Sequence, residues 1–150
     1  ADLTFVDMSN AYMWQGNMRR ARMQRVIISG AQFIDSDLRE ARLSGSTASP
    51  ETSFEDSWLD DTNLRGLDLT GVNFAHARMR NAMLRDCNLT GANFDRADLG
   101  DGDLGDTILV GTIFTNANLQ SVVLPREGEG RELAVYGNTT MPDGHLRNSG

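Results

Sequence analysis

The fold is decided by residues 54–124, which in groups of five read FEDSW LDDTN LRGLD LTGVN FAHAR MRNAM LRDCN LTGAN FDRAD LGDGD LGDTI LVGTI FTNAN LQSVV L. Every group begins with a bulky apolar residue. Two positions before that residue stands a residue that is usually small, such as Ala77, Ala92 or Ala117. The same period runs through residues 1–43, where the bulky positions are Leu3, Met8, Met13, Met18, Met23, Ile28, Phe33, Leu38 and Leu43.

A period of five fits neither a helix nor a flat strand. Five helical steps of about 100° rotate each bulky residue by about 140° from the last, and five strand steps put successive residues on opposite faces. A chain that turns a corner after each group can point every bulky residue at one axis. The phenylalanines indicate four corners per coil, because they recur every twenty residues, with one extra residue before Phe54. They are expected to form one internal column of Phe33, Phe54, Phe74, Phe94 and Phe114.

Three runs carry a family resemblance: Ala-Asn-Phe-Asp-Arg at 92–96, Ala-Asp-Leu-Gly-Asp at 97–101 and Ala-Asn-Leu-Gln-Ser at 117–121. They resemble the A(D/N)LXX consensus of the pentapeptide repeat family, over residues 1–124. The resemblance implies an all-β fold, a right-handed quadrilateral β-helix, which we expect to have about six coils. Its members occur in the bacterial cytoplasm, the periplasm and the thylakoid lumen. We expect a soluble protein of the bacterial cytoplasm, with the other two compartments as alternatives.

The chain divides into a repeat region and a tail. Residues 1–124 are expected to form the β-helix, and residues 44–53 break the period as a small bulge that contains Pro50. Residues 125–150 lose the period and are expected to form a short C-terminal cap, with Leu133, Val135 and Tyr136 as the covering side chains. The sequence indicates no cap at the N-terminal end. A homodimer formed through a solenoid end is therefore an open alternative.

Composition and motifs argue against several classes of function. The net charge of −7 disfavours direct binding of nucleic acid or of an anionic membrane, and no apolar run is long enough to span a bilayer. The histidines, His76 and His145, lie far apart, and Cys87 occupies a small inward position. No metal spacing or nucleophile motif is present. We therefore predict no enzyme activity, no catalytic residue, no metal and no cofactor.

Two surface features are candidates for binding a protein partner of unknown identity. One is an arginine cluster, interpreted first as a solvated face partly neutralised by acids such as Asp37 and Glu40, and second as a partner site. The cluster consists of Arg19, Arg20, Arg22 and Arg25. The other is an outward aromatic and apolar patch, which would mark an interface unless another segment covers it. It consists of Tyr12, Trp14, Ile34 and Trp58.

These features predict a non-enzymatic structural or protein-interaction module. The alternative is an acidic DNA mimic that binds DNA gyrase or another type II topoisomerase, as the resemblance implies for some family members. Mimicry requires carboxylates spaced along one face. The most acidic predicted face carries Asp37, Glu40, Asp60, Asp61, Asp98 and Asp101, but it also carries Arg19, Arg20, Arg39, Arg78 and Arg80.

Overall fold

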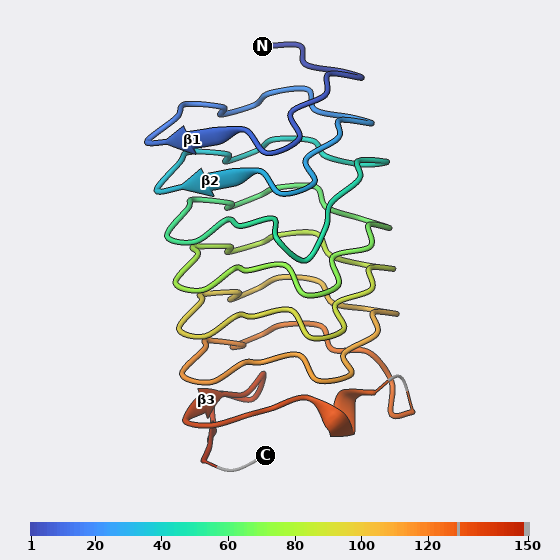
Figure 1. Cartoon of the computed structure of the whole chain (residues 1–150). Coiled ribbons are helices and arrows are strands. Elements are labelled where there is room, and N and C mark those ends of the chain that lie inside the picture. Colours follow the sequence, from blue (N-terminus) through green and yellow to red (C-terminus); the bar gives the residue numbers. More distant parts are fainter. Residues whose placement is uncertain (129, 149–150) are drawn as a thin grey trace.

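The computed structural model describes residues 1–128 and 130–148, and its chain winds into a four-sided coil that stacks on itself along one axis (Figure 1). Parallel β-bridges join each side to the side one coil away, at separations of 20 residues, as in Asn73 with Asn93, or of 21, as in Trp58 with Asp37. The predicted four groups per coil are confirmed by this register.

Regular elements are short because the chain bends after every five residues. Strand β1 (Tyr12–Trp14) pairs in parallel with β2 (Gln32–Ile34), and the other sides are single bridges. The tail contains a 3-10 turn, η1 (Arg131–Leu133), and an antiparallel hairpin of β3 (Thr139–Thr140) and β4 (Leu146–Arg147). The described residues hold no helix that is both long and apolar enough to cross a membrane.

The bridges define four outward faces. The first face carries Tyr12, Gln32, Ser53, Asn73, Asn93 and Ile113. The second carries Asn17, Asp37, Trp58, Arg78, Asp98 and Asn118. The third carries Asp2, Arg22, Arg42, Asn63, Met83, Asp103 and Val123. The fourth carries Asp7, Ile27, Thr47, Asp68, Asn88 and Ile108.

Residues 93–97 illustrate how the backbone donors of a five-residue group are satisfied. The N–H groups of Asn93, Phe94 and Arg96 donate to carbonyls of neighbouring coils, and that of Ala97 donates to the Phe94 carbonyl and closes a turn. The fifth donor, the Asp95 N–H, is bound by Oδ1 of Asn93 at 2.9 Å. The outward Asp or Asn of the consensus is therefore a side-chain acceptor for the turn that follows it.

The corners require a left-handed residue. The third residue of each turn has a positive φ, for example +57° at Arg96 and +60° at His76, while the residue before it does not. This combination is the type II turn, which favours Gly and Asn at that position. A column of four glycines, Gly30, Gly71, Gly91 and Gly111, occupies such corners, with φ between +66° and +70°.

The core is a set of inward columns, and the phenylalanine column is confirmed. Successive rings from Phe33 to Phe114 lie 4.8–5.4 Å apart, centroid to centroid, and within 17° of parallel. All five rings are fully buried. Cys87 also faces inward as predicted, and burial raises the pKa of its thiol to about 11.

The interruption at residues 44–53 is not confined to one corner, because it spans Thr47 on the fourth face and the turns on either side of it. Thr47 pairs with Ile27, but among the described residues it has no bridge to Asp68, so the ladder of the fourth face is broken there. Pro50 packs against the next coil, where a side chain on Gly71 would lie 2.9 Å from the Pro50 Cβ. Regular pairing resumes with Ser53, which bridges both Gln32 and Asn73.

The tail places one of its three expected covering side chains over the core. The Tyr136 ring is fully buried and lies 5.7 Å from the Phe114 ring, with the Arg147 guanidinium 4.3 Å from its other side. Leu133 and Val135 are exposed, so the expectation is wrong for them. Val135 continues the first face through its bridge to Ile113, which turns its side chain outward.

Replacing a central ring should destabilise the whole stack. Phe74→Ala is expected to lower the free energy of unfolding by about 3–5 kcal/mol. The Phe74 ring is buried within the column, and its removal leaves a cavity. Chemical denaturation measures this change. The control is Phe5→Ala, an exposed ring whose loss should cost no more than about 0.5 kcal/mol; equal losses would contradict the column.

Removing a turn acceptor should have a smaller, side-chain-specific cost. Asn93→Ala leaves the Asp95 N–H without its acceptor and should lower the free energy of unfolding by about 1 kcal/mol. Asn93→Ser should restore part of the loss, because Ser53 Oγ accepts the equivalent N–H of Glu55 on the same face. Denaturation curves in which Ser is no better than Ala would contradict the acceptor role.

Candidate functional site

The predicted aromatic residues lie at the corner between the first and second faces. Tyr12 and Trp14 belong to β1 and are 73% and 62% exposed, and Trp14 is in register with Ile34 of β2. Ile34 is half-buried. The strand pair holds these side chains on a backbone that is hydrogen bonded to the next coil, so the patch has a fixed position on the rod.

Trp58 lies around that corner, on the second face. Between it and the corner is a shallow hollow of about 280 Å³, lined by Gln15, Gly16, Asn17, Asp35, Asp37 and Trp58. Gln15 donates a hydrogen bond to Asp35 at 2.9 Å, so a polar pair lines the space beside Trp58. The Arg39 guanidinium lies 4.7 Å from the Trp58 ring, within cation–π range, although Trp58 remains 45% exposed.

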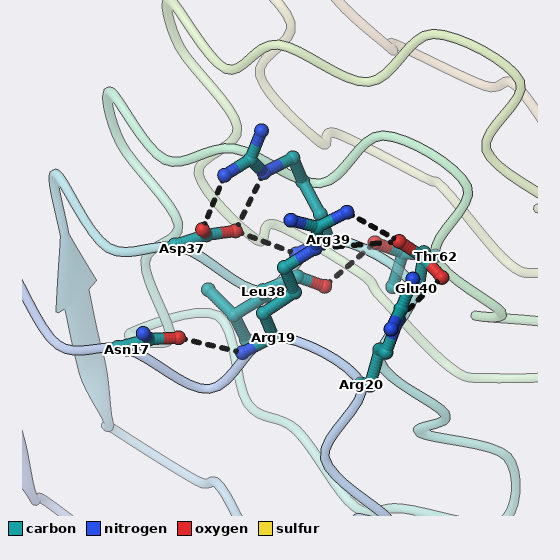
Figure 2. Close-up of polar contacts among 8 residues, drawn as sticks. All are labelled: Asn17, Arg19, Arg20, Asp37, Leu38, Arg39, Glu40 and Thr62. Carbon is teal, nitrogen blue, oxygen red and sulfur yellow. Dashed lines mark hydrogen bonds and ion pairs between the residues drawn. The ribbon is translucent and has the colours of Figure 1, made fainter.

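The predicted arginine cluster is divided among different partners. Arg19 and Arg20 both bind Glu40, one on each carboxylate oxygen and each at 2.9 Å (Figure 2). Arg22 faces outward on the third face, 3.7 Å from Asp2. Arg25 lies over the Phe5 ring at 5.5 Å. The predicted neutralisation by Glu40 is confirmed.

Asp37 pairs mainly with Arg39, and Arg19 of the cluster adds only a weaker electrostatic attraction. Nε and Nη2 of Arg39 both donate to the Asp37 carboxylate, at 2.9 and 2.6 Å (Figure 2). Hydrogen bonds from Arg39 lower the pKa of Asp37, and those from Arg20 and Arg19 lower the pKa of Glu40. Both carboxylates therefore stay ionised and paired at neutral pH.

The rest of the acidic face follows the same pattern. Arg78 contacts Asp60 at 3.2 Å, and Arg80 contacts Asp98 at 3.3 Å and Asp101 at 2.7 Å. Since the stacked coils place residues about twenty apart side by side, each arginine meets acids of adjacent coils. Asp61 is the member of the predicted acidic set for which the described residues supply no ion pair. The face is thus a mosaic of alternating charge.

Groups suited to catalysis are scattered. His76 lies 3.8 Å from Asp56 at an exposed corner, and His145 lies in the tail 3.2 Å from Asp143. The Cys87 thiol is buried and donates to the Leu64 carbonyl. Within residues 1–128 and 130–148, no cluster of His, Cys, Asp and Glu has the geometry of a metal site.

A further hollow lies where the sequence predicted no site. It is a groove of about 900 Å³ over the third face, which we call the third-face groove. Its lining is Arg20, Arg22, Gln24, Glu40, Ala41, Arg42, Ser44, Asp61, Asn63 and Met83. Only Arg20 and Arg22 were among the predicted site residues. Arg42, Asn63 and Met83 follow Arg22 at successive steps of one coil, a signal that appears only when the sequence is aligned by coil.

Comparison with solved structures finds similarity to pentapeptide repeat proteins. HetL, a pentapeptide repeat protein involved in heterocyst differentiation regulation in the cyanobacterium Nostoc sp. strain PCC 7120, is 24% identical, with a TM-score of 0.57 over 97% of this chain and 70% of HetL. A pentapeptide repeat protein of the Arabidopsis thaliana thylakoid lumen is 19% identical, with a TM-score of 0.35 over 97% of this chain and 83% of that protein. The similarity to HetL bears on the fold alone.

A third structure is trypsin-treated QnrB1, a plasmid-mediated fluoroquinolone resistance protein. It is 13% identical, with a TM-score of 0.34 over 88% of this chain and 92% of that protein. Among curated proteins, none matches the sequence.

The family itself is identified from the sequence repeats. The model of pentapeptide repeats matches in eight copies, over residues 1–39, 51–86 and 87–124. These ranges cover most of the chain and contain every phenylalanine of the internal column. The chain therefore belongs to the pentapeptide repeat family, whose fold is the right-handed quadrilateral β-helix.

Proposed function

We propose that this protein is a non-enzymatic interaction module that binds a protein partner through the corner between its first and second faces. The observation that carries the proposal is the exposure of Tyr12 and Trp14 on β1, at 73% and 62%. Large aromatic side chains are enriched at the centres of protein interfaces, where they are buried by the partner. Trp58 and Ile34 extend the same surface around the corner.

The rod is suited to this role because its surface is held in place. Backbone hydrogen bonds tie each coil to its neighbours, so little ordering is required when a partner binds. In this proposal the β-helix spans residues 1–124 in about six coils, and residues 125–150 cap it through the Tyr136 contact with Phe114. Leu3, Met8 and Met13 are only partly buried at the N-terminal end, where a homodimer would form; that pairing and a cytoplasmic location stay predictions.

DNA mimicry is the weaker candidate, for an electrostatic reason. Asp37, Asp60 and Asp98 are each within 3.3 Å of an arginine, so their charges are largely compensated within the face. A phosphate backbone presents an uninterrupted row of negative charge. The alternation of signs argues against imitation of that row.

Removing the aromatic side chains should weaken partner binding without unfolding the rod. We expect a Trp14→Ser and Trp58→Ser double variant to lose at least half of the partner captured by the wild-type protein in a quantitative pull-down. Both rings are exposed, so the denaturation midpoint should change little.

The matched control changes two exposed apolar residues of the third and fourth faces, Val123→Ser and Ile108→Ser. This control should retain wild-type capture. Identical capture by the Trp variant and the wild-type protein would remove the aromatic surface from the proposal.

Mimicry has its own test. Purified DNA gyrase is assayed for supercoiling of a relaxed plasmid with this protein added at micromolar concentration. The charge mosaic predicts no change in supercoiling activity. Inhibition that is abolished by Asp60→Asn and Asp98→Asn, but not by substitution of acids on the fourth face, would establish mimicry and displace the proposed function.

A further inference from the structure

The third-face groove crosses four successive coils, with residues 20–24, 40–44, 61–63 and 83 along its length. Its long axis therefore follows the axis of the rod. Neighbouring coils are about 4.8 Å apart, so the lining extends over about 14 Å. A site of this length and of about 900 Å³ accommodates several residues of an extended peptide.

One end of the groove carries positive charge that the protein neutralises only in part. Arg22 and Arg42 are bridged neighbours, which places their side chains one above the other. The nearest carboxylate to Arg22 is the exposed Asp2 at 3.7 Å. Arg42 is exposed and has no carboxylate partner within the part of the chain that the structure describes. This differs from the second face, where Arg39, Arg78 and Arg80 all have close acids.

A polar atom beside the two arginines also lacks a partner. Oε1 of Gln24, which lines the groove, is buried and receives no hydrogen bond within the described residues. A buried acceptor without a donor is costly, and a rotation of the Gln24 side chain toward the groove would let it accept an N–H of a bound group. Peptide backbones supply such donors at every residue other than proline.

The other end of the groove has a different character. Asn63 and Met83 continue the column of Arg22 and Arg42, and Met83 is partly exposed as an apolar surface. Asp61 lies beside them and adds a negative charge to this end. A continuous polyanion such as nucleic acid would be attracted at the arginines and repelled at Asp61. A ligand with one carboxylate and one apolar side chain fits both ends.

We propose that the third-face groove binds an extended acidic segment of a protein, with a carboxylate between Arg22 and Arg42 and an apolar side chain against Met83. The proposal rests on the proposed function, in that it assigns a second contact to the same kind of partner. Arg42 and Met83 are two coils, or about 10 Å, apart. Three residues of an extended segment in the polyproline II conformation span this distance at about 3.1 Å per residue and complete one turn, so residues three apart face the same side. The segment therefore carries its acidic and apolar residues three positions apart.

The experiment titrates ¹⁵N-labelled full chain with the peptide Leu-Thr-Thr-Glu-Thr-Thr-Leu, which offers the spacing in either chain direction. We expect amide shifts at Arg22, Gln24, Arg42, Asn63 and Met83, and a Kd that rises with ionic strength. The same peptide with Gln in place of Glu should bind at least about tenfold more weakly, because it lacks the charge that both guanidinium groups contact.

Variants separate this groove from general electrostatics. Arg22→Ala with Arg42→Ala should weaken binding of the Glu peptide by about tenfold or more. The control, Arg65→Ala with Arg96→Ala, makes the same change in net charge at corners whose arginines already face Asp86 and Asp95. The control should bind as the wild-type protein does. Circular dichroism of each variant establishes that the fold is retained.

Several results would contradict the proposed site. Equal binding of the Glu and Gln peptides, or shifts confined to Trp14 and Trp58, would overturn the groove as the site. So would inorganic phosphate or a 20-nucleotide poly-dT strand that reproduces the shifts with higher affinity, because each would assign the arginines to another ligand. Failure here leaves the pull-down result for the tryptophan variants unaffected, so the two proposals can fail separately.

Discussion

Hydrogen bonds between coils are the constraint on which this structure depends. A five-residue side is too short to satisfy its backbone alone, so its N–H groups reach the carbonyls of the coils above and below, as Phe94 reaches Ile113. Two donors remain in each group. One closes the turn. In groups that carry an outward Asp or Asn, the other is bound by that side chain, as the Asp95 N–H is bound by Asn93. The consensus sequence thus reflects how a chain that bends every five residues satisfies the five backbone N–H donors of each group.

The same constraint determines the side-chain neighbours. Because each side lies on the side twenty or twenty-one residues away, Phe74 meets Phe94 inside the rod and Arg42 meets Asn63 outside it. Charges interact in the same way, and Arg80 reaches Asp98 and Asp101 in the next coil. The surface properties of the rod are therefore determined by columns of residues about one coil apart. Similar residues that are neighbours in sequence are distributed over several faces.

That geometry explains what the sequence could and could not predict. The phenylalanine column and the inward Cys87 followed from the period alone, since each depends only on the position of a residue within its coil. The role of the outward Asp and Asn residues did not follow, because the period does not reveal that the turn leaves a donor beside them. Their hydrogen bonds required coordinates.

The candidate site was predicted only in part, for a related reason. The aromatic residues were predicted as one outward patch, but the stacking of Arg39 on Trp58 depends on rotamers. The arginine cluster was inferred from proximity along the sequence, which grouped Arg19 with Arg25. In the structure these two residues lie on different corners. The third-face groove was missed because its members, such as Arg22 and Met83, are far apart in sequence and close only through the stacking of coils.

The central claim is that backbone donors of one coil bind carbonyls one coil further on. The most direct measurement is NMR detection of scalar couplings across hydrogen bonds, which join the amide nitrogen of the donor to the carbonyl carbon of the acceptor. The structure predicts couplings from Phe54 to Asn73, from Phe74 to Asn93 and from Phe94 to Ile113. Couplings that instead join residues four apart, or strands at any other spacing, would contradict the account.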